Sequence, residues 1–479
     1  MLNSLISMYS PSYSAIIAYM LQSTEYQPWP YLKWFWRTQD FSKVAVRRQL
    51  IPTKASRLLR LIMLIGMLIQ LLVGLLLIYL WQWHNLTGGL AFGIALILSY
   101  PLVWAHLIVI PLWLGRIFIV QPREDHLVAM SENIFQRYKV PKIAIAGSYA
   151  KTSMKEILLT VLSEGKKVAA TPANKNVAVS HARFAQSLSK DIDIIIIEYG
   201  EGRPEDILRF TKTTHPTCGI ITGLAPAHLD HYKTIEKAGE DIFSLATYLE
   251  NKNVYVNGES ILAKPFIRPE FKIYTENGLA DWKVSNVRVT INGTSFHLDH
   301  KRRSLRLHTK LLGRHNIGPV ALAAVLADEF GLSSNQIIDG VAKTAAFEHR
   351  MQPYKLSEAW IIDDTYNGNI EGIKAGTALL AELPAKRKIY VTPGLVDQGK
   401  EKKAVHNQMG ELIAKSGCDV VVLMKNSTTH CIRNGLTQGG FSGQLRIETE
   451  PLKFYSNLSE FVAAGDIVML QNDWTDNYS

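Results

Sequence analysis

The sequence contains little cysteine and gives no sign of a disulfide framework. Its 479 residues include three cysteines, Cys218, Cys418 and Cys431, and none of them forms a Cys-x-x-Cys pair. An odd number of cysteines cannot be fully paired within one chain. The pattern therefore argues against a structural zinc site and indicates a protein that works in a reducing compartment.

The N-terminus lacks the pattern of a cleaved signal peptide, in which a basic segment precedes an apolar run. Acidic residues are also in deficit, with 42 Asp and Glu against 52 Lys and Arg, so the formal net charge is +10. A basic excess suits nucleic acid, a membrane surface or an anionic substrate. Much of this excess flanks the apolar segment near the N-terminus, which favours a membrane and argues against nucleic acid.

Two long, nearly uncharged apolar runs follow the first fifty residues. They extend from Leu58 to Trp81 and from Leu90 to Leu114. As helices, both runs are long enough to cross a hydrocarbon core of about 30 Å. The alternative is a buried helical hairpin in a soluble core, but core helices are seldom this long and this free of charge. We therefore predict a two-helix transmembrane hairpin.

Basic residues around the two runs predict the orientation of this hairpin. The link between the runs carries no Lys or Arg, whereas both outer flanks are basic. Lys and Arg are enriched on the cytoplasmic side of membrane spans. Both ends are therefore expected in the cytoplasm, which describes a multi-pass protein of the cell membrane whose domains after the second run are cytoplasmic. The flanking residues are Lys43, Arg47, Arg48, Lys54, Arg57 and Arg60 before the first run, and Arg116 and Arg123 after the second.

A candidate phosphate-binding loop begins shortly after Pro141. A buried strand, Lys142 to Ala146, leads into a loop of small residues and then into a helix. Backbone N–H groups and the helix N-terminus bind phosphate in such a unit. Lys151 would reach the β- and γ-phosphates of ATP, and a hydroxyl would bind Mg²⁺. The loop consists of Gly147, Ser148, Tyr149, Ala150, Lys151, Thr152 and Ser153.

The ends of two later strands supply further polar groups. An apolar run from Asp193 ends at the carboxylate of Glu198, and the strand at Cys218 leads to His228. Ligands gather at the carboxyl ends of parallel strands. We expect Glu198 and His228 to bind Mg²⁺ together with Thr152 or Ser153, although a lone histidine is more often structural. The candidate catalytic residues are Lys151, Glu198 and His228.

From about residue 140 onward, the sequence resembles the Mur ligases of peptidoglycan synthesis. The loop from Gly147 to Ser153 is similar to the phosphate loop of that family, although Ala150 replaces its second glycine. Other strings that resemble family motifs follow in the family's order. They are Thr171–Asn176, Glu198–Gly200, Ala225–Asp230, Leu312–Asn316, His349–Met351 and Asp363–Asn369.

The resemblance implies an α/β chain with three regions. These would be an N-terminal membrane region over 1–122, a P-loop-type central ATP-binding domain over 123–347 and a Rossmann-like C-terminal domain over 348–479. It also implies ATP and Mg²⁺ as cofactors and an adenine contact for Asn316. Further ATP-binding residues implied in this way are Arg350, Asp364, Tyr366 and Asn367.

Within the family, the sequence is most similar to the branch that adds D-alanyl-D-alanine to UDP-MurNAc-tripeptide. The implied function is an ATP-dependent amide ligase that acts through an acyl phosphate. It would join a cell-wall precursor to an amine-bearing amino acid or dipeptide.

Two departures from the family pattern leave alternatives open. Gly239 stands where the family usually has a carbamylated lysine, which puts a second Mg²⁺ in doubt. The membrane hairpin occupies the place of the family's UDP-binding N-terminal domain. One alternative is an amide ligase of another class, such as poly-glutamate-type synthesis. The other is a membrane scaffold that binds nucleotide and catalyses weakly.

Overall fold

The computed structural model describes residues 2–24, 26–44, 52–173, 175–226, 232–301, 303–366, 368–396, 398 and 401–472. The predicted site residues His228 and Asn367 lie outside these ranges. Internal contacts divide the chain into two compact units, Met1–His126 and Leu127–Ser479.

The N-terminal unit contains a pair of long apolar helices, α4 (Lys54–His84) and α5 (Gly89–Leu107). Small residues let the two helices approach closely, because a Cβ added at Gly93 would lie 2.6 Å from the carbonyl oxygen of Gly74. The first predicted run lies within α4. The second is divided, because α5 ends at Leu107 and α6 (Val109–Gly115) follows it.

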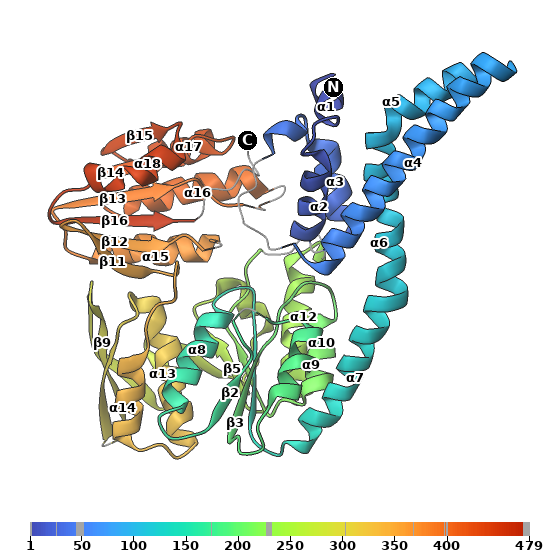
Figure 1. Ribbon diagram of the computed structural model, residues 1–479. Coiled ribbons are helices and arrows are strands. Elements are labelled where there is room, and N and C mark those ends of the chain that lie inside the picture. The colour runs from blue at the N-terminus through green and yellow to red at the C-terminus, as the bar shows by residue number, and fades with distance from the viewer. Residues whose placement is uncertain are drawn as a thin grey trace. The chain divides into compact units, whose positions relative to one another are not determined.

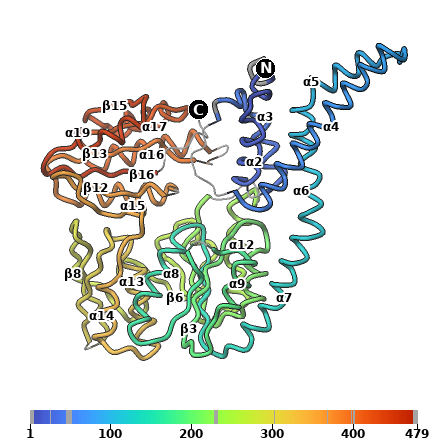
Figure 2. The backbone as a smooth tube through the Cα atoms, viewed as in Figure 1, coloured from blue at the N-terminus to red at the C-terminus, as the bar shows by residue number. Residues whose placement is uncertain are grey.

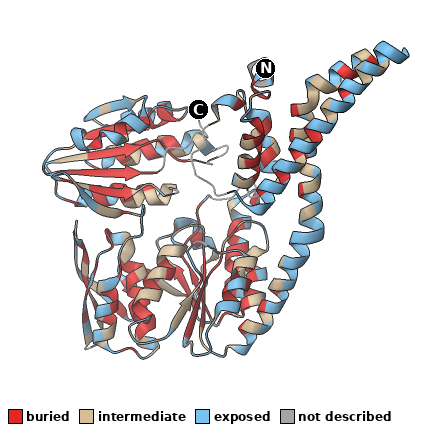
Figure 3. Cartoon of the chain, viewed as in Figure 1, coloured by how far each residue is buried: buried red, intermediate tan, exposed pale blue. Residues whose placement is uncertain are grey.

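Three short helices cover only one part of this pair. They are α1 (Leu2–Ser7), α2 (Tyr13–Ser23) and α3 (Pro28–Arg37). Hydroxyl groups fix α2 and α3 to α5, since Tyr13 donates to the carbonyl of Pro101 at 3.2 Å and Tyr31 donates to that of Ala105 at 2.8 Å. Only a minority of the residues of α4 and α5 is buried, although both helices are strongly apolar (Figure 3).

The second unit begins with a large sheet in the order β10-β9-β8-β7-β6-β5-β4-β1-β3-β2. Strands β1 to β6 are parallel to one another, whereas β7 to β10 form an antiparallel extension that begins at the β6–β7 pair. The bounds are β1 (Lys142–Ala146), β2 (Val168–Ala170), β3 (Ile194–Glu198), β4 (Cys218–Ile221), β5 (Val254–Asn257), β6 (Lys272–Thr275), β7 (Gly278–Leu279), β8 (Trp282–Thr290), β9 (Gly293–His300) and β10 (Arg303–Thr309).

Helices cover both faces of the parallel part of this sheet (Figure 1). Alternate residues of β1 enter separate cores, Ile143 on one face and Ala144 on the other. Burial on both faces explains why these strands are almost continuously apolar. One face packs against α8 (Lys151–Leu162), α13 (Ile317–Glu329) and α14 (Ser334–Lys343). The other packs against α7 (Gln121–Arg137), α9 (Ala178–Ser187), α10 (Asp206–Thr214) and α12 (Ile235–Tyr248).

A second sheet follows in the order β11-β12-β16-β13-β14-β15, parallel except for β11. It is formed by the C-terminal part of the chain, coloured orange to red in Figure 2. Apolar runs near residues 388, 419 and 466 form its strands β13, β14 and β16. The strand bounds are β11 (Gln352–Leu356), β12 (Ala359–Asp364), β13 (Arg387–Thr392), β14 (Val420–Met424), β15 (Gln444–Glu448) and β16 (Asp466–Gln471). The helices are α15 (Ile370–Glu382), α16 (Lys402–Lys415), α17 (Thr429–Gln438), α18 (Pro451–Ser456) and α19 (Leu458–Phe461).

Candidate nucleotide-binding site

The predicted phosphate loop connects β1 to α8. Gly147 has φ +142°, and a Cβ at this position would lie 2.3 Å from the hydroxyl of Thr222, so a side chain has no room here. The N–H of Ser148 donates to the carbonyl of Gly223 at 2.9 Å, which ties the loop to the end of β4. Ala150 precedes the first residue of α8 and has φ +56°. The loop therefore leads into the N-terminus of a helix, where anions bind favourably.

Lys151 is held within the loop by two oxygen atoms. Its Nζ donates to the carbonyl of Gly147 and to Oε2 of Glu201, both at 2.5 Å. The side chains of Lys151 and Glu201 are 11% and 3% exposed. Sequence reasoning did not single out Glu201, although its place just after the carboxyl end of β3 was an available signal.

Glu198 lies at the end of β3, as predicted, and its carboxylate is buried. Its Oε1 accepts from the hydroxyl of Thr152 at 2.9 Å and from Asn176 at 3.3 Å. Its Oε2 is buried without a hydrogen bond. Carboxylate and hydroxyl oxygens are the ligands that Mg²⁺ prefers, so the donor set of Glu198 and Thr152 fits this ion. Ser153 instead lines a neighbouring cavity.

A second lysine, which sequence reasoning missed, neutralises Glu198. Lys155 lies one helical turn after Lys151, and its ammonium is 3.2 Å from Oε2 of Glu198 with no exposed side-chain surface. It also lies 3.4 Å from Glu156 and donates to the carbonyl of Ala173. A fully buried charge requires such partners. The spacing of four residues on one helix was the available signal.

The metal contact predicted for His228 lies outside the described residues. Within the described ranges, no group of three or more His, Cys, Asp or Glu side chains is arranged to hold a metal ion. The metal roles of Thr152, Ser153, Glu198 and His228 therefore stay predictions.

The structure gives a physical reason for the glycine at position 239. Gly239 is buried on α12, and a Cβ added there would lie 2.3 Å from the ring of Phe266. A lysine at this position therefore has no room while Phe266 keeps its place. Lys237, two residues earlier, is exposed and does not fill the same position.

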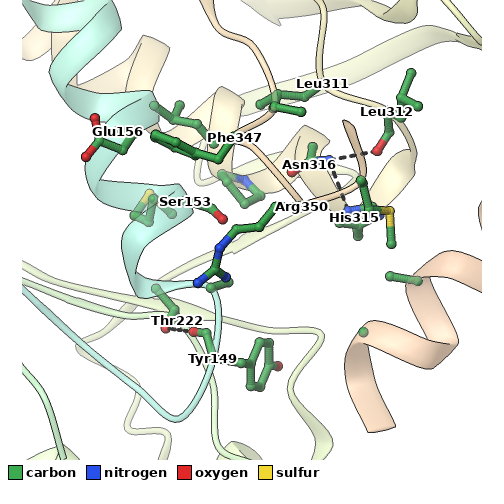
Figure 4. A pocket seen from close by; sticks show the side chains of 18 of the residues that line it. Tyr149, Ser153, Glu156, Thr222, Leu311, Leu312, His315, Asn316, Phe347 and Arg350 are labelled. Carbon is green, nitrogen blue, oxygen red and sulfur yellow. Dashed lines mark hydrogen bonds between the residues drawn. The ribbon is translucent and has the colours of Figure 1, made fainter. Parts of the chain in front are cut away.

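A cavity of about 530 Å³ opens beside the phosphate loop (Figure 4). This volume lies within the range of small-molecule sites, about 300–1,000 Å³. Seven of the predicted ATP-binding residues line it, and they come from both sheets of the unit. They are Tyr149, Ala150, Ser153, Asn316, Arg350, Asp364 and Tyr366. Gly147, Ser148, Lys151 and Thr152 are not among its lining residues.

On the side of the cavity away from the phosphate loop, hydrogen bonds and a cation–π contact hold the lining side chains in place. Asn316 donates to the carbonyl of Leu312 at 2.8 Å, and the guanidinium of Arg350 lies 4.4 Å from the ring centroid of Tyr366. Asp364 accepts from the N–H of Met351 at 3.2 Å. Burial raises the pKa of Asp364 to about 6. The cavity also includes residues that sequence reasoning missed, among them Asn257, Glu259, Tyr274 and Phe347.

Comparison with protein families gives two matches in sequence order. Residues 145–327 match the Mur ligase middle domain, and residues 349–471 match the glutamate ligase domain of Mur ligases. UDP-N-acetylmuramoyl-tripeptide–D-alanyl-D-alanine ligase of Escherichia coli is 30% identical over 298 residues, 60% of this chain and 65% of that protein. The corresponding ligase of Synechocystis is 28% identical over 314 residues, 63% of this chain and 66% of that protein. The chain thus spans about two thirds of the length of these relatives.

Solved structures with the same fold include MurF ligases. MurF of Thermotoga maritima in complex with ADP aligns with a TM-score of 0.63 and 19% identity, over 73% of this chain and 80% of that chain. MurF of Acinetobacter baumannii aligns with a TM-score of 0.62 and 19% identity, over 73% and 77%. Folylpolyglutamate synthase of Mycobacterium tuberculosis aligns with a TM-score of 0.55 and 15% identity, over 73% and 92%. With both family domains present in order and matching well over half of its residues, the chain belongs to the Mur ligase family.

Proposed function

We propose that this protein is a membrane-anchored, ATP-dependent amide ligase that acts on a peptidoglycan precursor. The observation that carries the proposal is the cavity beside the phosphate loop, which collects the nucleotide residues expected of this family from both domains. The named relatives are ligases that join D-alanyl-D-alanine to UDP-N-acetylmuramoyl-tripeptide. We infer the same pair of substrates for this chain.

The reaction would proceed in two steps. A carboxylate oxygen of the acceptor bonds to the γ-phosphorus of ATP while the bond to ADP breaks, which gives an acyl phosphate. The amine of the second substrate then bonds to the acyl carbon, loses a proton and expels phosphate. Lys151 would stabilise negative charge on the transferred phosphoryl group. Mg²⁺, when bound by Glu198 and Thr152, would supply further charge neutralisation.

The residues on the opposite wall of the cavity would position the nucleotide. Asn316 and Arg350 offer hydrogen-bond donors, and Tyr366 offers an aromatic face. Because Arg350 and Tyr366 come from a different domain than Lys151 and Asn316, nucleotide binding would bring the two domains together. Closure of this kind excludes water from a reactive acyl phosphate.

We further propose that two helical segments span the membrane. The first is α4, and the second lies in the helical stretch Gly89–Arg137, which begins with α5. Their most apolar windows have mean hydropathies of 2.9 and 2.1, yet only 28% and 22% of those windows is buried. A core helix of a soluble protein would be mostly covered, so this apolar surface requires another cover. Lipid would supply it, and the basic flanks favour a cytoplasmic location for the catalytic domains.

Two other functions are less well supported. A poly-glutamate-type ligase shares the fold, as the likeness to folylpolyglutamate synthase illustrates. The relatives with greater sequence identity are nevertheless dipeptide-adding enzymes. A scaffold with weak catalysis is favoured by Gly239, but the pairing of Thr152 with Glu198 beside Lys151 retains the groups that phosphoryl transfer requires.

Depletion of the protein in its native cells tests the proposed substrate. Mass spectrometry of the cell-wall precursors should show accumulation of a tripeptide-bearing species. Wild-type protein should restore the normal pattern, and Lys151→Ala should not. Unchanged precursors on depletion would contradict the proposed function.

A further inference from the structure

The phosphate-loop lysine has a partner that the nucleotide would have to replace. Lys151 directs its ammonium at Glu201 and at the carbonyl of Gly147, both at 2.5 Å. Its neighbours Ala150 and Ser153 line the cavity, whereas Lys151 does not. Contact between Lys151 and a phosphate in that cavity therefore requires the ammonium to leave Glu201.

Glu201 is the more deeply buried member of this pair. Its side chain is 3% exposed. The segment that follows it is held by Tyr232, whose hydroxyl donates to the carbonyl of Arg203 at 3.0 Å and to Asp241 at 2.7 Å. Lys151 has a long side chain with several rotatable bonds. Exchange of partners is therefore expected to move Lys151 and to leave the Glu201 carboxylate in place.

The charges around the loop are balanced in pairs. Lys155 neutralises Glu198, and Lys151 neutralises Glu201. If Lys151 turned to a phosphate, Glu201 would become a buried carboxylate without an ion-pair partner among the residues that the structure describes, which is strongly unfavourable. A divalent cation that arrives with the nucleotide would offset this negative charge.

We propose that Glu201 is a positioning residue that competes with nucleotide phosphate for Lys151, so that nucleotide binds tightly only when a divalent cation accompanies it. This inference rests on the proposed function only insofar as the cavity takes a nucleotide. It assigns to Glu201 a control over binding that does not depend on which acceptor or amine is used.

The test measures binding of a non-hydrolysable ATP analogue to the full-length protein in nanodiscs, by calorimetry, with EDTA or with Mg²⁺. Glu201→Gln should bind the analogue roughly three- to thirtyfold more tightly in EDTA, a factor within the range expected for residues coupled in one ion-pair network. The gain in affinity on adding Mg²⁺ should shrink correspondingly. Glu205→Gln is the matched control, because Glu205 is an exposed carboxylate on the same segment, and it should bind like the wild type.

A double-mutant cycle separates this competition from a general charge effect. In a Lys151→Met background, Glu201→Gln should no longer change the affinity in EDTA, because the lysine through which it acts is gone. A gain that persists in that background would overturn the proposal. Glu201→Asp keeps the charge but shortens the side chain, which withdraws the carboxylate from Lys151. This variant should also bind the analogue more tightly in EDTA, by a smaller factor than Glu201→Gln. It replaces Glu201→Gln in the test if the glutamine variant does not fold.

The inference and the proposed function fail in different ways. A wild type that binds the analogue, with Glu201→Gln equal or weaker in EDTA, would overturn the role of Glu201 alone. A wild type that binds no analogue with or without Mg²⁺ would overturn the nucleotide site, and the role of Glu201 with it.

Discussion

Ala150 occupies a backbone conformation that favours glycine. Its φ of +56° lies in the left-handed region, directly before α8. A residue with a Cβ loses about 1 kcal/mol there relative to glycine. We predict that Ala150→Gly raises the free energy of unfolding by up to about 0.6 kcal/mol, after allowance for the greater freedom of glycine in the unfolded chain. Denaturant titration of the full-length protein measures this, and a lower stability would show that the alanine side chain makes a compensating contact.

His181 should make the folded protein sensitive to acid. Its side chain is buried, and its Nε2 lies 2.8 Å from the carbonyl oxygen of Glu198. Burial lowers the pKa of His181 from 6.5 to about 4. Between these two values the unfolded chain binds a proton that the folded chain excludes, so this contribution to stability is lost as the pH falls from 6.5 toward 4.

The variant His181→Gln tests this contribution. Glutamine can keep a donor to the Glu198 carbonyl, but it does not titrate. The stability of the variant should therefore fall less steeply than that of the wild type as the pH is lowered from 6.5 to 4. Thermal unfolding at several pH values measures both slopes, and equal slopes would contradict the assignment.

At the scale of single residues, the sequence predicted those site residues that stand next to a recognisable strand, loop or helix pattern. Glu198 could be placed because an apolar strand leads directly to it, and Lys151 because a strand, a small-residue loop and a helix surround it. The pairing of Lys151 with Glu201 could not be predicted, because it joins two loops fifty positions apart. Lys155 was missed for a similar reason, since a lysine on a helix is usually solvated.

At the scale of the elements, the packing of α12 against Phe266 limits which side chain position 239 can carry. A side chain on this part of α12 would overlap the ring of Phe266. We predict that Gly239→Lys lowers the free energy of unfolding by about 1–3 kcal/mol, the usual cost of overpacking a core, without raising turnover. Turnover of the wild type should also be independent of bicarbonate, which a carbamylated lysine would need. Higher turnover in Gly239→Lys with added bicarbonate would contradict this account.

Among the elements, parallel strands were the easiest to predict. Strands β1, β3 and β4 are short apolar runs because helices cover both faces of the sheet. The antiparallel extension β7 to β10 was not predicted, because its strands carry exposed polar residues at alternate positions and resemble loops in composition. The break between α5 and α6 was also missed, although Pro111 removes a helical hydrogen-bond donor nearby.

The whole molecule joins an apolar helical unit to a Mur ligase pair of domains. The order of these parts could be predicted, since long apolar runs and ordered motifs are properties of the linear sequence. The cavity could be predicted only in part, because its far wall is built from residues of several separate segments. Asn257, Glu259 and Tyr274 enter it through the fold of β5 and β6 rather than through a motif.

The proposed topology predicts a protection pattern in intact cells. Protease added outside should leave the region after residue 120 undigested, because the proposed orientation, inferred from the basic flanks, puts this region in the cytoplasm. The short link between α4 and α5 would be the accessible part. Immunoblotting with a C-terminal tag measures this, permeabilised cells are the control, and digestion of the tagged region in intact cells would contradict the orientation.

The measurement that tests the central claim most directly is product formation by the purified full-length protein in nanodiscs. The reaction contains ATP, Mg²⁺, UDP-MurNAc-tripeptide and D-alanyl-D-alanine, and it is followed by phosphate release and mass spectrometry. We predict one phosphate released for each amide formed, dependence on both substrates, and loss of both signals in Lys151→Ala. ATP hydrolysis that needs neither substrate, or phosphate release without an amide product, would contradict the assignment of this protein as an amide ligase.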